Sequence, residues 1–398
     1  MSRIPDLVRA EVEKERERIL KDLKQYIAIN TVNPPGNEGV LADLIAADMK
    51  SAGAQVEYKQ FMPGRPNLVC TLDFGRGRCV LLNAHMDTVP IGNADWTYDP
   101  FGGEEHDGRI YGRGACDDKG GLAAMAGAMR VLARLPLDLC GEVVYNPIAW
   151  EEGGGKGTQH FVQNGMIGKK PAAVVIGEPT SCDIALGHNG SARRLVVVRG
   201  KAAHSSDPKR GENAIYRAAR FSLEIERLEQ QLRHKKHPLI GSPTTSVNII
   251  SGGVKHNVVP DRVEMTLDRR LIPGETPELF DKEITTIIER LKLDDTTFDA
   301  EVAALDMGKK PAWTNESQEI VKKSISAARK VLLREPGITG LGCGTDMTYF
   351  SIDAGIPTII FGPGDIARAH AVDEYVPVSE VIEATMFYVM LCIEYLTA

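Results

Sequence analysis

The stretch GRIYGRGACDDKGG, residues 108–121, decides the fold of this chain. It follows the apolar run CVLLNAHMD at 79–87 and precedes a segment, 122–135, that is rich in Ala, Leu, Met and Val. The first run fits a strand buried on both faces, and the second fits a buried helix. Two adjacent carboxylates between them, Asp117 and Asp118, indicate a helix cap or a ligand site, because the start of a helix favours negative charge.

Composition limits the classes of function. The chain has 398 residues, 43% of them hydrophobic and 25% charged, and its formal net charge is −7. The length favours two domains, and the negative charge argues against nucleic acid or an anionic membrane as a partner. Seven cysteines without CxxC spacing indicate free thiols in a reducing compartment. The N-terminal segment predicts a charged helix rather than a signal peptide, and no apolar run reaches membrane-spanning length, so we expect a cytoplasmic protein.

The order of expected elements divides the chain into three segments. Strands and helices alternate through residues 1–187 and again through 307–398, which predicts an α/β domain with a mixed sheet flanked by helices. Residues 188–306 follow the order β-α-β-β-α-β of a ferredoxin-like α+β module. We therefore expect this module to be inserted into the chain of the α/β domain.

Acidic and histidine residues occur where expected strands end, which is where ligands bind in open α/β sheets. They are His85, Asp87, Asp117, Glu151, Glu152, Glu178 and, far along the chain, His370. Taken singly, each fits an ordinary structural role, such as a core histidine or a solvated turn. Together, two imidazoles and three carboxylates, one of them bridging, suit a pair of divalent ions of the zinc type. A carboxylate that stays uncoordinated can act as a base.

Six motifs, in this order along nearly the whole chain, carry a resemblance to a known family. They are HMDTVP (85–90), GRGACDDKGG (112–121), EEGGGKGT (151–158), GEPT (177–180), GKAAHSS (200–206) and AHAVDEYV (369–376). The sequence resembles the M20 family of metallopeptidases, in particular the acetylornithine deacetylase/succinyl-diaminopimelate desuccinylase group. The resemblance implies a catalytic domain like that of zinc aminopeptidases and carboxypeptidases, with the inserted module serving as a lid and dimerisation domain.

The resemblance also implies roles for residues of the α/β domain. One metal ion would be held by His85 and Glu178 and the other by Glu152 and His370, with Asp117 bridging the two. The ions are expected to be Zn²⁺, with Co²⁺ or Mn²⁺ as alternatives, because supply and geometry decide occupancy.

Two further carboxylates have implied roles beside the metal ligands. Asp87 would orient His85, and Glu151 would be the general base that activates a metal-bridging hydroxide. The resemblance implies a non-proline cis bond at Asp117–Asp118. This sequence departs from the family pattern at Asp118, where Met is usual, and at Trp150, where a small or acidic residue is commoner.

Two further residues, His204 and Arg270, match positions that contact substrate in this family. His204 would stabilise the tetrahedral oxyanion, often across a dimer interface, and Arg270 would grip a substrate carboxylate. Arg269 competes for the second role, because strand alternation turns only one of the two arginines outward. Asn257 and Thr345 are expected to line the pocket.

The residues and the resemblance together predict a co-catalytic di-zinc amidohydrolase that cleaves the amide bond of a small N-acyl amino acid. The resemblance implies a homodimer formed through the inserted domain. A dipeptidase or carboxypeptidase of the same family is the alternative, because the scissile bond is an amide in both. A metal-free binding protein is a third reading, disfavoured because every ligand and the base are present. We expect Cys116 to be structural, since it lies among acids that raise a thiol pKa.

Overall fold

The computed structural model describes residues 3–165, 168–306 and 308–397. Contacts within the chain divide it into two compact units. Unit 1 comprises residues 1–187, 313–340 and 345–398, and unit 2 comprises residues 188–312 and 341–344. Unit 2 is thus an insertion in the chain of unit 1. The domain boundaries expected from the sequence, 187/188 and 306/307, stay a prediction.

Unit 1 is built on a mixed nine-stranded sheet in the order β1-β2-β6-β3-β7-β17-β8-β15, with β16 paired to β8. Its strands are β1 (Gln55–Met62), β2 (Arg65–Asp73), β3 (Arg78–His85), β6 (Gly141–Ile148), β7 (Ala173–Ile176), β8 (Ile184–His188), β15 (Ala312–Trp313), β16 (Ile338–Leu341) and β17 (Thr358–Ile360). The central strands β6, β3, β7 and β17 run parallel to one another. They are almost wholly buried, as apolar strands covered on both faces should be.

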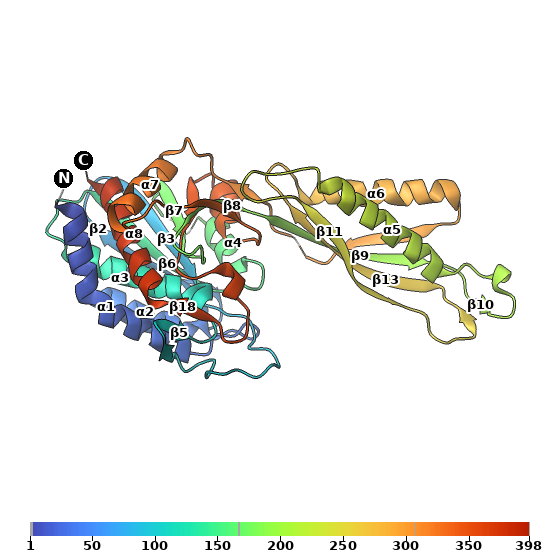
Figure 1. Cartoon of the computed structure of the whole chain (residues 1–398), viewed down its shortest axis with the longest axis horizontal. Helices are drawn as coiled ribbons and strands as arrows, with labels where there is room; N and C mark the ends of the chain where they lie inside the picture. The colour runs from blue at the N-terminus through green and yellow to red at the C-terminus, as the bar shows by residue number, and fades with distance from the viewer. Residues whose placement is uncertain (1–2, 166–167, 307, 398) are drawn as a thin grey trace. The chain divides into compact units, whose positions relative to one another are not determined.

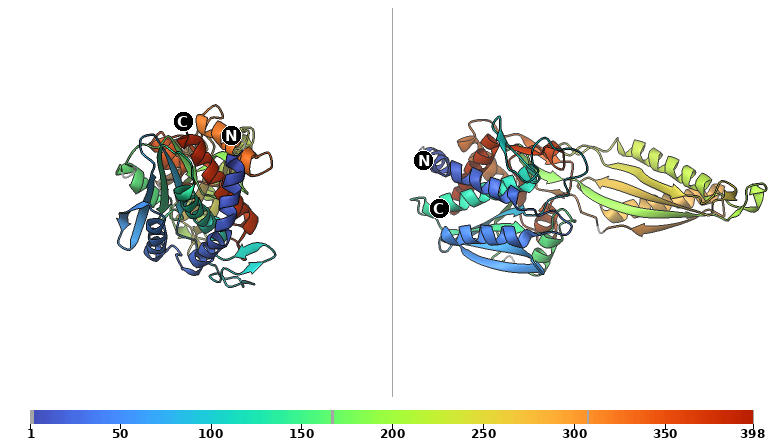
Figure 2. Two further views of the ribbon diagram at one scale, coloured as in Figure 1. Left: turned by 90° about the vertical axis from the view of Figure 1, so that its left-hand side faces the viewer. Right: turned by 90° about the horizontal axis from the view of Figure 1, so that it is seen from below.

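Helices flank this sheet (Figures 1 and 2). They are α1 (Ile4–Ala28), α2 (Glu38–Ser51), α3 (Gly120–Arg134), α4 (Lys156–Gln163), α7 (Glu319–Val331) and α8 (Val378–Leu396). Helices α1, α3, α7 and α8 pack on one another, whereas α2 and α4 contact β1. Helix α3 is buried along nearly its whole length because its side chains are small and apolar, which confirms the buried helix expected after residue 121.

A small three-stranded sheet brings together two segments that are far apart in the sequence. Its order is β18-β5-β4, from strands β4 (Glu105–His106), β5 (Arg109–Tyr111) and β18 (Tyr375–Pro377). Tyr375 pairs with Tyr111 in this sheet. The chain just after His370 therefore lies beside the chain just before Asp117.

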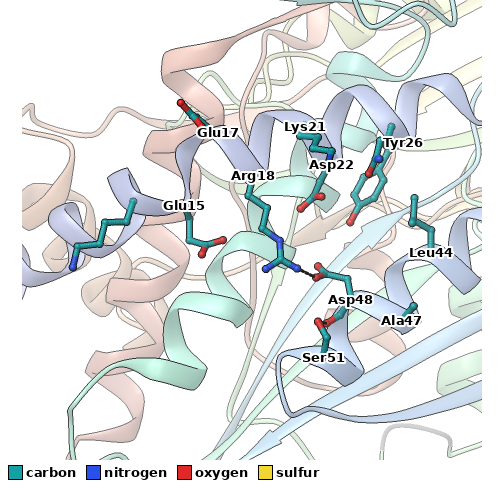
Figure 3. A pocket seen from close by; sticks show the side chains of 12 residues that line it. Glu15, Glu17, Arg18, Lys21, Asp22, Tyr26, Leu44, Ala47, Asp48 and Ser51 are labelled. Carbon is teal, nitrogen blue, oxygen red and sulfur yellow. Dashed lines mark hydrogen bonds and ion pairs between the residues drawn. The ribbon is translucent and has the colours of Figure 1, made fainter.

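A buried arginine joins helices α1, α2 and α3. Arg130 of α3 is 4% exposed and donates Nε–H to Glu15 at 2.9 Å, and it also pairs with Asp22 and Asp48. Asp48 pairs in addition with Arg18 at the edge of a groove of about 680 Å³ between α1 and α2 (Figure 3). None of the site residues expected from the sequence lines this groove. We therefore assign its charges to helix packing.

The carboxylates of Asp117 and Asp118 do not cap α3, contrary to one of the two expectations. They lie in a π-helical turn, η1 (Ala115–Lys119), and Lys119 at the start of α3 makes no side-chain cap. Asp118 instead accepts the backbone N–H of His85 at 3.4 Å, and its other oxygen is buried without a hydrogen-bond partner. The peptide bond Asp117–Asp118 is cis, as the resemblance implied.

Unit 2 has the ferredoxin-like topology expected from its element order. Strands β9 (Gly190–Arg199), β11 (Thr244–Gly252), β13 (Arg262–Leu271) and β14 (Asp299–Ala304) form an antiparallel sheet in the order β11-β13-β9-β14. Helices α5 (Ala214–Leu232) and α6 (Pro277–Asp294) pack on it through an apolar core. Asn213 and Thr276 cap the two helices by accepting backbone N–H groups. A two-stranded ribbon, β10 (Ala203–His204) and β12 (Val258–Val259), completes the unit.

The fold class is therefore confirmed, a mixed α/β sheet with flanking helices, whereas the sequence did not predict several short strands. Strands β8, β15 and β16 at one edge of the main sheet were not expected, nor was the sheet of β4, β5 and β18. Each is two to five residues long, too short to show a hydrophobic period. No helix in the described ranges combines the length and apolar character of a membrane-spanning segment.

Candidate active site

The sheet of unit 1 places four of the expected site residues at one edge. His85 ends β3, Glu151 and Glu152 follow the end of β6, and Glu178 follows the end of β7. Strands β6, β3 and β7 are adjacent and parallel, with His85 paired to Ile148. Because their carboxyl ends meet at the same edge, side chains separated by up to 93 positions converge.

Asp117 lies between two imidazoles, one on each of its carboxylate oxygens. Its Oδ1 is 2.8 Å from Nε2 of His85, and its Oδ2 is 3.2 Å from Nε2 of His370. Asp117 is 6% exposed and His85 is 3% exposed, whereas the side chain of His370 is 52% exposed. A carboxylate with a different imidazole on each oxygen has the arrangement that a bridging ligand needs.

Each imidazole has one glutamate near it, Glu178 near His85 and Glu152 near His370. Glu178 Oε1 lies 3.9 Å from Nε2 of His85, and Glu152 Oε1 lies 3.0 Å from Nε2 of His370. Ligand atoms of His85, Asp117 and Glu152 lie within 4.8 Å of one another, and so do those of His85, Glu151 and Glu178. The five residues expected as metal ligands and the expected base are thus in one cluster.

The charges of this cluster are strongly coupled. Burial lowers the pKa of His85, but its contacts with Asp117 and Asp87 outweigh that and hold the pKa well above its usual value. Hydrogen bonds to Asp117 and Glu152 raise the pKa of His370 to about 10. Burial, together with the nearby negative Asp117, raises the pKa of Glu152 to about 7 and holds the pKa of Glu178 well above its usual value. Several carboxylates buried around two imidazoles make a site that favours cations.

Asp87 holds the loop that carries the two glutamates. Its carboxylate accepts the backbone N–H of Glu151 at 2.9 Å and that of Glu152 at 3.2 Å, and it accepts Nδ2–H of Asn33 at 2.8 Å. Nδ1 of His85 is 2.9 Å from the main-chain carbonyl of Asp87 and 3.6 Å from its carboxylate. Asp87 thus orients His85 mainly through its main chain, while its carboxylate fixes the positions of Glu151 and Glu152.

The donor set fits two divalent metal ions. The observation that decides this is Asp117, which presents one oxygen to His85 with Glu178 and the other to His370 with Glu152. Imidazole nitrogen and carboxylate oxygen are typical zinc ligands, and a pair of sites sharing one carboxylate is typical of co-catalytic centres.

Two expected substrate residues of unit 2 lie side by side. His204 pairs with Val258 in the β10–β12 ribbon, and the backbone N–H of Ser205 donates to the carbonyl of Asn257 at 3.1 Å. The ring of His204 is exposed, and its Nδ1 is 2.8 Å from Oγ of Ser206. The ribbon therefore holds an imidazole and an amide together, although 53 positions separate them in the sequence.

Strand β13 separates the two adjacent arginines, as alternation predicts. Arg269 is fully buried and pairs with Glu275 and Glu283 inside unit 2. Arg270 points the other way, with 34% of its side chain exposed and Nε donating to Asp268 at 2.9 Å. Arg270 is therefore the arginine of this pair that can reach a ligand.

Thr345 and Cys116 have mainly structural surroundings. Thr345 is fully buried, and its Oγ1 accepts the backbone N–H of Met347 at 3.2 Å. Its role in a substrate pocket stays a prediction. Burial raises the pKa of the Cys116 thiol well above its usual value, and its Sγ lies 3.3 Å from the carbonyl of Asp365.

Sequence reasoning missed Arg113 and Glu374, which form a buried ion pair beside the cluster. Glu374 accepts the backbone N–H groups of Cys116 and Asp117, each at 3.0 Å. Both residues lie inside quoted motifs, GRGACDDKGG and AHAVDEYV. The sequence signal that could have pointed to them was their place inside these two motifs.

Comparisons with known proteins identify the family of this chain. The model of peptidase family M20/M25/M40 matches residues 81–394. The chain is 33% identical over 372 residues to acetylornithine deacetylase of Myxococcus xanthus, covering 90% of this chain and 93% of the relative.

Solved structures support the fold. Aminopeptidase PepT of Bacillus cereus superposes with a TM-score of 0.78 at 22% identity, covering 96% of this chain and 98% of its own. The YXEP protein of Bacillus subtilis, described as a dinuclear metal-binding M20 peptidase, gives 0.74 at 15% identity, covering 96% and 99%. From the matched family model and the relative in Myxococcus, this chain belongs to peptidase family M20/M25/M40 and is a metal-dependent hydrolase of that family.

Proposed function

We propose that this protein is a co-catalytic di-zinc amidohydrolase that removes the acyl group from a small N-acyl amino acid. The observation that carries the proposal is Asp117, whose two oxygens face His85 and His370. The likeness to an acetylornithine deacetylase supports the deacylase class over the dipeptidase or carboxypeptidase alternative.

The proposed ligands follow the contacts of Asp117. His85 and Glu178 would hold one ion and Glu152 and His370 the other, with Asp117 as the shared ligand. When bound, the two ions supply Lewis-acid polarisation of the scissile carbonyl and acidify a water molecule. We propose zinc because imidazole and carboxylate groups are typical zinc ligands. Cobalt or manganese can bind the same donors.

Glu151 is the proposed general base. It is 8% exposed, and its carboxylate lies within 4.8 Å of ligand atoms of both His85 and Glu178. Its backbone is held by Asp87, so the carboxylate is directed before substrate arrives. In the proposed reaction Glu151 accepts a proton from the attacking water and delivers it to the leaving nitrogen.

Three residues of unit 2 and one of unit 1 are proposed to bind substrate. His204 stabilises the developing oxyanion, and Asn257 beside it offers an amide. Arg270 grips the substrate carboxylate, since its guanidinium fork matches a carboxylate and Arg269 is already occupied by Glu275. Thr345 is proposed for the pocket wall on the resemblance alone.

The first test of the function is a substrate panel with and without metal. We expect release of free amine from N-acetyl- or N-succinyl-amino acids, loss of that activity with a chelator, and its return with Zn²⁺. Preference for aminoacyl-amino acids would establish the dipeptidase alternative. Activity that survives complete metal removal, checked by elemental analysis, would contradict the di-zinc mechanism.

The exposed edge of unit 2 supports the proposed homodimer. Strand β11 lies at the end of its sheet, and its residues Ile249 and Ile250 are 62% and 58% exposed. Helix α5 contacts β11 and exposes Tyr216 and Leu223, 68% and 55%. An apolar edge strand beside apolar side chains is a surface that a second copy can cover by pairing strands.

Introducing positive charges on the exposed strand β11 should therefore dissociate the dimer. We expect the variant with Ile249→Lys and Ile250→Lys to elute as a monomer in size-exclusion chromatography with light scattering, where the wild type elutes as a dimer. Leu293→Lys, at an 83% exposed position on α6, is the matched control and should stay dimeric. A wild type that is monomeric and fully active would contradict both the dimer and any action of His204 across it.

A further inference from the structure

We infer that Arg113 and Glu374 form a positioning pair that sets the spacing of Asp117 and His370, and through it the affinity of the site for its second metal ion. Neither residue is assigned a role as ligand or base, and the inference rests on the proposed two-metal function. Both residues belong to unit 1, where the whole cluster lies.

Glu374 holds the main chain of the bridging residue. One carboxylate oxygen accepts the N–H groups of both Cys116 and Asp117 at 3.0 Å. Its other oxygen pairs with Nη1 of Arg113 at 2.5 Å. The carbonyl of Glu374 also accepts the N–H of Gly112 at 2.9 Å. The segment after His370 is therefore bonded to both ends of the turn that presents Asp117.

Arg113 holds the main chain of His370. Its Nη2 donates to the carbonyl of His370 at 3.4 Å and to that of Pro90 at 3.3 Å, and its Nη1 donates to the carbonyl of Ala371 at 3.2 Å. Its guanidinium carbon lies 5.1 Å from the centre of the Trp96 ring. One guanidinium thus connects the segments after His85, before Asp117 and around His370.

His370 needs such support more than the other ligands do. Its backbone has φ of +63°, in the left-handed region that a residue with a side chain seldom adopts. Its side chain is half exposed, so packing fixes its position less than it fixes His85. The hydrogen bonds that Arg113 donates to the carbonyls of His370 and Ala371 stabilise this backbone conformation.

Stability alone does not account for such a pair. Arg113 is 2% exposed and Glu374 is 1% exposed, and a fully buried ion pair often contributes little net stability compared with apolar residues of the same volume. Groups that orient metal ligands typically change metal affinity by about 10–100-fold when they are altered. The geometry therefore assigns this pair to positioning.

The experiment is calorimetric titration of the metal-free protein with Zn²⁺. For Glu374→Gln we expect the weaker of the two binding events to lose about 10–100-fold in affinity, with a smaller change in the tighter one. The amide keeps the shape of the side chain but must turn N–H groups toward either Arg113 or the backbone N–H groups. Arg113→Lys, which keeps the ion pair but cannot reach three carbonyls at once, should weaken the same event.

The matched control is Glu15→Gln, which removes the charge from another buried carboxylate–arginine contact of unit 1, with Arg130. It should lower the melting temperature without changing either zinc affinity. Unchanged affinities in Glu374→Gln and Arg113→Lys, or an equal change in the control, would overturn the positioning role. A wild type that binds fewer than two zinc ions would instead overturn the proposed function on which the inference rests.

Discussion

Replacing Glu151 by alanine should lower kcat by about 10²–10⁴-fold and leave both metal ions bound, because it removes a base and no ligand. The buried Glu151 carboxylate faces the cluster, while its backbone N–H stays bonded to Asp87. The loop that carries Glu152 should therefore keep its position. The measurement is steady-state kinetics together with zinc content by elemental analysis.

The neighbouring glutamate is the control for this experiment. Glu152→Ala should lose both turnover and metal, because Glu152 Oε1 lies 3.0 Å from Nε2 of His370 and is a proposed ligand. Equal metal loss in the two variants would mean that the roles of base and ligand are assigned to the wrong glutamates. If Glu152→Ala loses turnover but keeps its full metal content, then Glu152 is the base and Glu151 is the ligand.

Asp117→Asn should have the largest effect of any single substitution in the site. It removes the one carboxylate that both proposed metal positions share, and it replaces one oxygen by an NH₂ group that cannot bind a cation. We expect fewer than two zinc ions per chain and a loss of kcat/KM of at least about 10³-fold, the scale of removing a preorganised electrostatic group.

Substitution of the adjacent residue, Asp118, tests whether the effect of Asp117→Asn comes from the loss of a bridging ligand or from the loss of any buried negative charge. Asp118→Asn changes a carboxylate that is equally buried but accepts only the backbone N–H of His85. It should keep both metal ions. If Asp118→Asn releases zinc as Asp117→Asn does, then the acidic pair acts as a unit and the bridging assignment is wrong.

The sequence predicted which residues meet because the site follows from the order of strands. His85, Glu152 and Glu178 each come at or just after an apolar segment, and parallel strands in one sheet end at one edge. Asp117 was also predicted among these residues, and the resemblance implied its bridging role. The hydrophobic pattern of residues 188–306 likewise gave the order of elements in the inserted module.

The structure differs from the sequence-based predictions where a contact depends on a residue far away in the sequence. A helix cap was one of the two alternatives for Asp117 and Asp118. The backbone of Asp117 is not helical, however, and both side chains contact residues of β3 or the site. A local pattern cannot show this, because the competing partner, His85, lies 32 positions away. Short edge strands such as β15 and β16 were missed for the same reason, since their pairing depends on neighbours and not on a period.

The sequence by itself determined the family, the element order and the chemical identity of the candidate metal ligands. The family follows from the six motifs, the element order from hydrophobic periods, and the candidate ligands from residue types at strand ends, all of which are local features of the sequence. Only the tertiary structure showed that each oxygen of Asp117 has its own imidazole, that Arg269 is buried and Arg270 is not, and that Glu374 holds the backbone of a residue 257 positions away. Each of these depends on which side chains approach within hydrogen-bond distance, and that is set by the packing of the whole sheet.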